Sequence, residues 1–144
     1  MYKKADNSES WKAFFKDLQE LCQVQGIDIY DIITWIDDSL GPIEKENFDY
    51  HISSGPVPDE PSQKMDIDIL LGDKIYIFTM TAAGKNSVIC PVNKFSYYEE
   101  EITGSFIKAT FYGQGFYVFV NASVANSSKL RQFAHKVLDL AWGK

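Results

Sequence analysis

Long apolar runs are missing from the sequence. No stretch of 18 apolar residues occurs, so no membrane-spanning helix is expected. The N-terminal stretch "MYKKADNSESWKAFF" has no apolar run before its first predicted helix, so it does not resemble a secretory signal. We therefore expect a cytoplasmic protein.

Metal-ligating residues are few. The sequence has two cysteines and two histidines, and neither His51 nor His135 has a second histidine or a cysteine at ligand spacing. We therefore expect no metal site, and a surface or structural role for both histidines. Cys22 lies in a predicted helix and Cys90 in a predicted strand. We expect two reduced core thiols, with a disulfide as the alternative.

Basic clusters and catalytic motifs are also scarce. The chain has 14 basic and 20 acidic residues, a net charge of −6, and its longest basic cluster is Lys3-Lys4. Nucleic acids and anionic membranes attract basic patches, so neither is an expected partner. No P-loop, no glycine-rich dinucleotide motif and no Ser-His-Asp order is present. We expect no cofactor and no enzymatic activity.

Two amphipathic helices are predicted at the N-terminal end, over 8–24 and 28–40, because apolar residues recur there every three to four positions. The short link between them predicts an antiparallel helical hairpin over 8–40. Residues suited to begin or end these helices flank both stretches. They are Asp6, Asn7, Ser8, Gly26, Gly41 and Pro42.

From residue 48 onward, the apolar period changes to two, which is typical of strands. Seven strands separated mostly by short turns are predicted, and short connections favour antiparallel neighbours. The segment "SGPVPDEPSQ" holds three of the five prolines and predicts a mobile surface loop. The strand stretches are "NFDYHIS", "MDIDILL", "KIYIFTMT", "SVICPV", "KFSYYEEE", "SFIKATFY" and "FYVFVN".

The segment 106–120 joins the last two of these strands through Gly113-Gln114-Gly115. A hairpin with a tight turn is the expected structure, and a functional glycine hinge is the alternative. A third amphipathic helix is predicted over 125–142 and should cover an apolar face of the sheet. The sequence thus predicts an α+β protein with one domain over 1–144. In it, 48–144 forms a seven-stranded antiparallel bent sheet, or partly open barrel, with a C-terminal capping helix.

This element order resembles that of a pleckstrin-homology-like domain of bacterial type, over 69–138. The resemblance implies a binding or assembly module. Phosphoinositide binders of that family carry basic residues around the first hairpin loop. Here the corresponding loop carries Asp59 and Glu60, with only Lys64 at its edge, which disfavours lipid headgroup binding. The stretches that carry the resemblance are "ILLGDKIYIF", "VICPVNKFSYYEEE", "SFIKATFYGQGFYVFV" and "KLRQFAHKVLDLAW".

Two strands carry paired acids. Asp66 and Asp68 alternate with apolar residues, so we expect them on a solvated face, with a metal-binding pair as the alternative. The run "YYEEE" at 97–101 is the candidate partner surface, because aromatics enrich interface cores and acids steer encounters. The other interpretation is an edge strand protected against aggregation by its carboxylates. The candidate residues are Tyr97, Tyr98, Glu99, Glu100 and Glu101.

Three functions follow as hypotheses. The first is a non-catalytic binding or assembly module that acts through a protein partner or through self-association. The second is an acidic immunity-type protein that neutralises a basic toxin, supported by the net charge of −6. The third is a small-molecule carrier, which requires a deep pocket with converging polar groups. The aromatic residues that could line such a pocket are Phe106, Phe111, Phe116 and Tyr117.

Overall fold

The computed structural model describes residues 7–143. Its chain divides into two compact units, one ending at Phe48 and the other beginning at Asp49. Within the described residues, no helix is long and apolar enough to cross a membrane. Cys22, in the first unit, and Cys90, in the second, are both buried and free. Burial raises the pKa of each thiol, which makes both poor nucleophiles.

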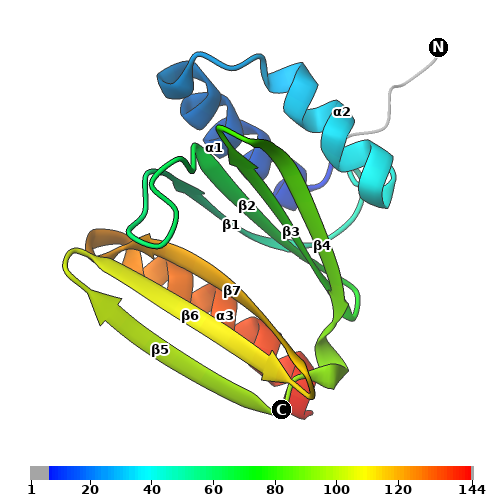
Figure 1. The fold of residues 1–144 in the computed structure, drawn as a ribbon. Coiled ribbons are helices and arrows are strands. Elements are labelled where there is room, and N and C mark those ends of the chain that lie inside the picture. The colour runs from blue at the N-terminus through cyan, green and yellow to red at the C-terminus, as the bar shows by residue number, and fades with distance from the viewer. Residues whose placement is uncertain (1–6, 144) are drawn as a thin grey trace. The chain divides into compact units, whose positions relative to one another are not determined.

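The first unit contains the two predicted helices, α1 (Glu9–Gln25) and α2 (Ile29–Leu40), which run in opposite directions (Figure 1). Ser8 begins α1, because its Oγ accepts a hydrogen bond from the Trp11 N–H at 3.1 Å. Gly26 ends that helix with a φ of 68°, which glycine adopts without strain. Asp6, the other candidate cap, lies outside the described residues.

The apolar stripes of these helices are buried as predicted. Within the unit, Phe14 contacts Phe48 edge to face, with ring centroids 5.6 Å apart. The Ser8 N–H also donates to the Glu44 carbonyl at 2.7 Å, which ties the start of α1 to the segment after α2. The buried helical residues are Trp11, Phe14, Leu18, Cys22, Ile32 and Ile36.

The second unit holds seven antiparallel strands and a C-terminal helix, which confirms the predicted α+β class (Figure 1). Four strands pair in the order β1-β2-β3-β4 and three in the order β5-β6-β7. The strands are β1 (Asp49–Ser54), β2 (Met65–Leu71), β3 (Lys74–Thr81), β4 (Gly84–Pro91), β5 (Tyr97–Thr103), β6 (Phe106–Gly113) and β7 (Phe116–Ser123).

Within the described residues, the strands form two separate sheets, of four and of three strands, and no closed barrel. The break lies between β4 and β5, where the 3₁₀ turn η1 (Val92–Lys94) interrupts the chain. Pro91 precedes this turn and has no N–H to continue a ladder. The Val92 N–H donates instead to the Asp73 carbonyl at 2.9 Å, so the turn is fastened to the β2–β3 connection.

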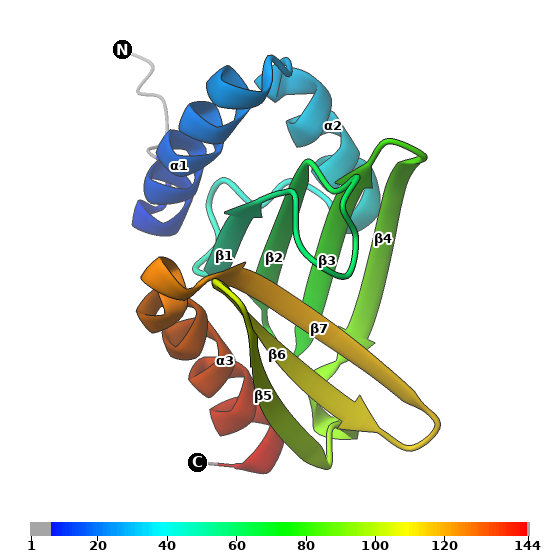
Figure 2. The same cartoon turned by 60° about the vertical axis from the view of Figure 1, so that its left-hand side comes forward.

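Helix α3 (Ser127–Trp142) lies along the three-stranded sheet, as both views show (Figures 1 and 2), and follows the short 3₁₀ turn η2 (Val124–Asn126). The prediction of a C-terminal capping helix is therefore confirmed. The Trp142 indole N–H donates to the Phe95 carbonyl at 3.2 Å, which fixes the end of the helix. The core of this unit includes Leu70, Ile75, Ile77, Ile107, Ala109, Phe111, Val118, Val120, Ala122, Leu130, Phe133, Ala134 and Val137.

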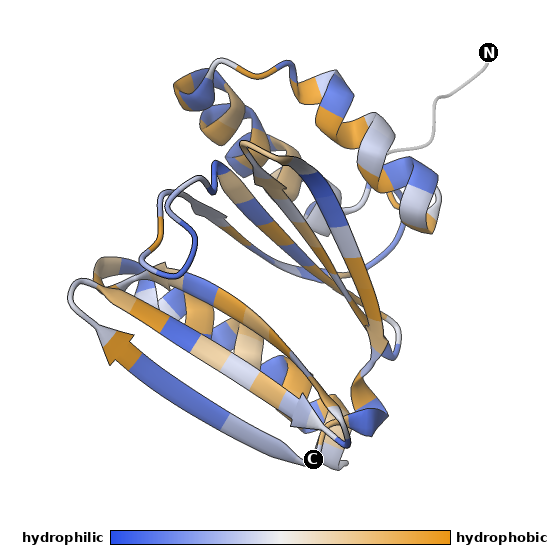
Figure 3. Cartoon of the chain, viewed as in Figure 1, coloured by the Kyte–Doolittle hydropathy of each residue, from blue (hydrophilic) through white to orange (hydrophobic). Residues whose placement is uncertain are grey.

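The β6–β7 connection is a tight hairpin, as predicted. Gly113 pairs with Phe116, so only Gln114 and Gly115 form the turn. Gly115 has a φ of 83°, a backbone conformation that residues with a Cβ atom rarely adopt. Alternating colours along β6 and β7 in Figure 3 show why the hairpin has one apolar face and one mixed face.

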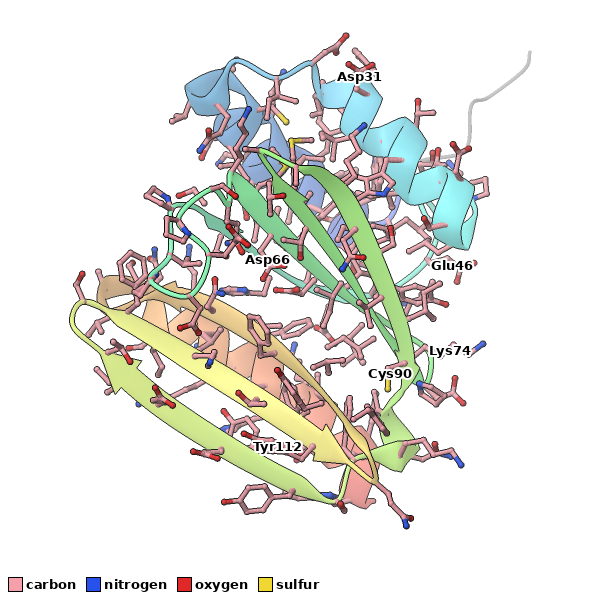
Figure 4. All side chains as sticks on the ribbon, viewed as in Figure 1. Asp31, Glu46, Asp66, Lys74, Cys90 and Tyr112 are labelled. Carbon is pink, nitrogen blue, oxygen red and sulfur yellow. The ribbon has the colours of Figure 1, made fainter. Side chains whose placement is uncertain are left out.

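The expectation of a solvated face for Asp66 and Asp68 is wrong. Asp66 is 3% exposed and Asp68 is fully buried. Both share the inner face of β2 with Leu70, which packs into the core beside α3. Figure 4 shows Asp66 in the region between the two sheets. Strand alternation is correct here, but both faces of β2 are covered, because Ile67 and Ile69 on the opposite face are also fully buried.

Candidate functional site: the outer face of the three-stranded sheet

The three-stranded sheet has one face toward the core and one face away from it. Pairing of β5, β6 and β7 places alternate residues of each strand on the second face, which we call the outer face. It consists of Tyr97, Glu99, Glu101 and Thr103 from β5, Phe106, Lys108, Thr110 and Tyr112 from β6, and Tyr117, Phe119 and Asn121 from β7.

One end of the outer face is a row of three tyrosines. Tyr97 pairs with Tyr112, and Tyr112 pairs with Tyr117. The ring centroids are 5.2 Å apart in the first pair and 5.9 Å apart in the second. Tyr97 is 56% exposed and Tyr117 is 61% exposed, while Tyr112, labelled in Figure 4, lies between them on β6. Three large aromatic side chains thus form a continuous aromatic surface, in which neighbouring rings are tilted by 49° and 42°.

Carboxylates lie next to these rings. The Tyr112 hydroxyl donates to Glu99 Oε2 at 3.3 Å, and Glu101 lies opposite Lys108 across the strand pair. Lys108 Nζ is 2.7 Å from Asp59 Oδ2 and 5.2 Å from the centroid of the Phe119 ring. The hydrogen bond to Asp59 raises the pKa of Lys108, so this ammonium remains charged. The face already holds one cation between acids and an aromatic ring.

Residues of β5 on the other face belong to a different environment. The Tyr98 hydroxyl donates to Glu100 Oε2 at 2.7 Å, and Arg131 Nε of α3 donates to Glu100 Oε1 at 3.1 Å. The Tyr98 hydrogen bond lowers the pKa of Glu100, and burial raises the pKa of Tyr98. The five candidate residues at 97–101 therefore divide, with three on the outer face and two beside α3.

Several members of the outer face were not recognised in the sequence. Lys108, Tyr112 and Phe119 lie on β6 and β7, outside the "YYEEE" run. The two-residue turn offers a signal for one of them, because it places Tyr112 opposite Tyr117. The pairing of β5 with β6 depends on a second turn, Gly104-Ser105, which places Thr103 opposite Phe106.

A second group of polar side chains is buried on the face of the four-stranded sheet that α3 contacts. His51 Nδ1 lies 3.3 Å from Asp68 Oδ2, and the Thr79 hydroxyl donates to Asp66 Oδ1 at 3.3 Å. The His51 ring also lies beside Phe133 of α3, with centroids 6.2 Å apart. This group fastens β1, β2, β3 and α3 together.

Burial determines the protonation of this group. It raises the pKa of both Asp66 and Asp68, and the adjacent Asp68 carboxyl raises that of Asp66 further. Burial lowers the pKa of His51 to about 4, with Lys129 adding to the effect and Asp66 opposing it. His51 is therefore uncharged at neutral pH, and burial favours the protonated form of both carboxyls. No three His, Cys, Asp or Glu side chains of residues 7–143 are placed to hold a metal ion.

The four aromatic residues proposed for a ligand pocket do not converge. Phe111 is buried in the core, stacked on Phe95 at a centroid distance of 5.2 Å. Tyr117 points to the outer face, and Phe116 lies at the hairpin turn. Phe106 lines a hollow beside the β1–β2 loop. The other histidine, His135, is exposed on α3.

Comparisons of the chain with protein-family models, with curated proteins and with solved structures each gave no match. The outer face is therefore interpreted from its own chemistry.

Proposed function

We propose that the protein is a non-catalytic binding module whose outer face holds a basic, extended segment of a partner protein. The observation that carries this proposal is the exposed tyrosine row lying beside carboxylates on one face of a sheet. Tyrosine supplies large contact area at a low entropic cost, and carboxylates steer and pair with cations. A binding or assembly module is also what the pleckstrin-homology-like resemblance of the element order implies.

Charge complementarity selects a basic partner. Around the outer face, three carboxylates face one ammonium: Glu99, Glu101 and Asp59 against Lys108. The contact between Lys108 and Phe119 shows how a cation sits over this face. The same face would repel an acidic segment. Because β5 is the last strand of its sheet, an extended segment can also lie along its unpaired edge.

The test uses a fluorescent peptide of about nine residues, slightly longer than β5, in which arginine alternates with threonine. Binding is followed by fluorescence anisotropy at low and high salt, and mapped by amide chemical shifts. We expect micromolar binding that weakens as salt rises, with shifts on β5, β6 and β7. A peptide with glutamate in place of arginine should not bind.

A matched pair of variants separates the two faces of β5. Changing Glu99→Gln together with Glu101→Gln should weaken binding about tenfold, because two charge-assisted contacts are lost. Glu100→Gln lies on the same strand but beside α3, and should change binding less than twofold. Equal binding of acidic and basic peptides, or shifts confined to other elements, would show the proposal to be wrong.

The second candidate, an immunity-type protein, is favoured by the net charge of −6 together with the acidic outer face. This function differs from the binding module in the affinity for its partner and in the effect of binding on the partner's activity. A single basic protein bound at nanomolar Kd, with its toxicity abolished on binding, would support it. Retention of that toxicity in the complex would count against it.

A further inference from the structure

A hollow lies at the end of the outer face farthest from the tyrosine row. It has a volume of about 310 Å³, including the open space at its mouth. Its apolar walls are Val57 and Pro58 from the β1–β2 loop and Phe106 and Ile107 from β6. Val57 is itself buried, so this part of the proline-rich loop is packed against the protein.

Polar groups of the hollow are mostly acceptors. Asp59 comes from the same loop, Glu101 from β5 and Asn121 from β7. The one cationic group, Lys108, bonds to Asp59 at 2.7 Å and so fastens the loop to the sheet across 49 residues of sequence. Glu101, opposite Lys108 across the strand pair, accepts a hydrogen bond from the Thr103 hydroxyl at 3.2 Å.

Asn121, which lines the hollow, has a buried side-chain oxygen without a hydrogen-bond partner among the described residues. Its side chain is only 4% exposed, and within the described residues its Oδ1 accepts no hydrogen bond. Buried acceptors are normally paired, because desolvation without a hydrogen bond is unfavourable. An occupant that donates to this oxygen would remove the penalty. The same occupant should be cationic, because Asp59 and Glu101 lie around it.

Arginine meets these conditions better than lysine. Its guanidinium is planar and has five N–H donors, so it can bond to Asn121 Oδ1 and a carboxylate together while its flat face lies on apolar walls. A lysine ammonium is a compact, strongly hydrated charge that gains less from Pro58 and Phe106.

We propose that this hollow is a socket for one arginine side chain of the partner, with Asn121 Oδ1 as the acceptor that distinguishes arginine from lysine. The inference rests on the proposed function, because it assigns a specific subsite on the same outer face. The tyrosine row then contacts the body of the segment, and the socket holds its anchoring side chain.

The test titrates the protein with Nα-acetyl-arginine methylamide and, separately, with the lysine and citrulline analogues. Amide chemical shifts at Asn121 and its neighbours are the readout. We expect millimolar binding of the arginine compound, at least about fivefold weaker binding of the lysine compound, and weaker binding still of the uncharged citrulline. Equal responses to arginine and lysine would overturn the socket.

Two variants and a control complete the test. Asn121→Leu keeps a similar volume without the acceptor, and should weaken arginine binding about tenfold. Asn121→Asp adds a charge at the same atom, should bind arginine more tightly, and decides the question if Asn121→Leu does not fold. Glu100→Gln, on β5 but beside α3 and outside the outer face, should leave binding unchanged. Unchanged affinity in both Asn121 variants would overturn the socket.

The outcomes separate this inference from the proposed function. If the basic peptide binds the tyrosine row but Asn121→Leu binds it equally well, the socket is wrong and the binding module stands. If the arginine compound shifts Asn121 while no basic peptide binds, the socket stands and the proposed function is wrong. If neither probe binds, both are wrong.

Discussion

Two strands of the second unit carry a pair of acidic residues two positions apart, and the two pairs differ in their exposure to solvent. Asp66 and Asp68 on β2 are buried, whereas Glu99 and Glu101 on β5 are exposed. β2 is an inner strand between β1 and β3, and its acid-bearing face turns toward α3. β5 is an edge strand, and its acids lie on the outer face.

The difference teaches that alternation indicates which residues share a face, and not which face is covered. On β2, apolar residues alternate with acids as on many half-exposed strands. Its acids are tolerated inside because they form hydrogen bonds with each other, with Thr79 and with His51, and because burial favours their protonated forms. On β5, water solvates the carboxylates, and they remain available to a partner.

Replacing one acid of each pair with lysine should give the largest difference in the free energy of unfolding. Asp68→Lys places an unpaired ammonium in the core beside neutral His51, and should cost more than about 4 kcal/mol of the free energy of unfolding or prevent folding. Glu101→Lys on the exposed face should change it by less than about 0.5 kcal/mol. Urea denaturation followed by circular dichroism measures both. An Asp68→Lys protein as stable as the wild type would mean that the inner face of β2 is open to water.

The buried pair should also make stability depend on pH. Above pH ~4, the raised pKa values let the folded protein keep a proton that unfolded aspartate has lost, so the free energy of unfolding falls as pH rises. His51 acts oppositely between its folded pKa of about 4 and its unfolded value near 6.5, where the unfolded state binds the extra proton. Above pH ~6.5, only the carboxyl contribution remains.

We therefore expect stability to decrease as pH rises above about 6.5, until the folded carboxyls ionise, by up to about 1.4 kcal/mol per pH unit for each retained proton. Asp66→Asn should flatten this profile, because an amide does not titrate and can still accept from Thr79. Glu99→Gln should keep the wild-type slope. Urea denaturation at several pH values measures all three proteins, and a flat wild-type profile would contradict the retained proton.

The smallest expected difference in stability is between variants of two neighbouring tyrosines of β5. Tyr98→Phe removes the hydroxyl that donates to Glu100 at 2.7 Å, and should cost about 0.5–1.5 kcal/mol. Tyr97→Phe on the exposed outer face should change stability by less than about 0.5 kcal/mol. Thermal and urea unfolding of the two variants side by side measure this difference. A larger loss for Tyr97→Phe would reverse the assignment of the two faces.

Much of the fold could be predicted because the relevant signals are local. The three helices follow from apolar residues at helical spacing, and Ser8 and Gly26 mark the ends of the first. The seven strands follow from a period of two interrupted by glycine-containing turns such as Gln114-Gly115. Each signal involves residues within one or two turns of each other, so the backbone geometry alone connects the pattern to the element.

The candidate site could be predicted only in part. The "YYEEE" run drew attention to β5, and its alternation correctly separates Tyr97, Glu99 and Glu101 from their neighbours. The other members of the outer face depend on the register of three strands. The hollow depends further on the β1–β2 loop returning to β6, a contact of Asp59 with Lys108 between residues distant in the chain.

The sequence by itself determined the helices, the strands and the hairpin turn. It also determined which residues of one strand or helix share a face, because all of these depend on spacing along the chain. Only the tertiary structure decided that the seven strands divide into two sheets, that Asp66 and Asp68 face inward, and that Asn121 lines a hollow between acids. Burial depends on which distant segment covers a face, and that choice comes from the packing of the whole unit, which no local period records.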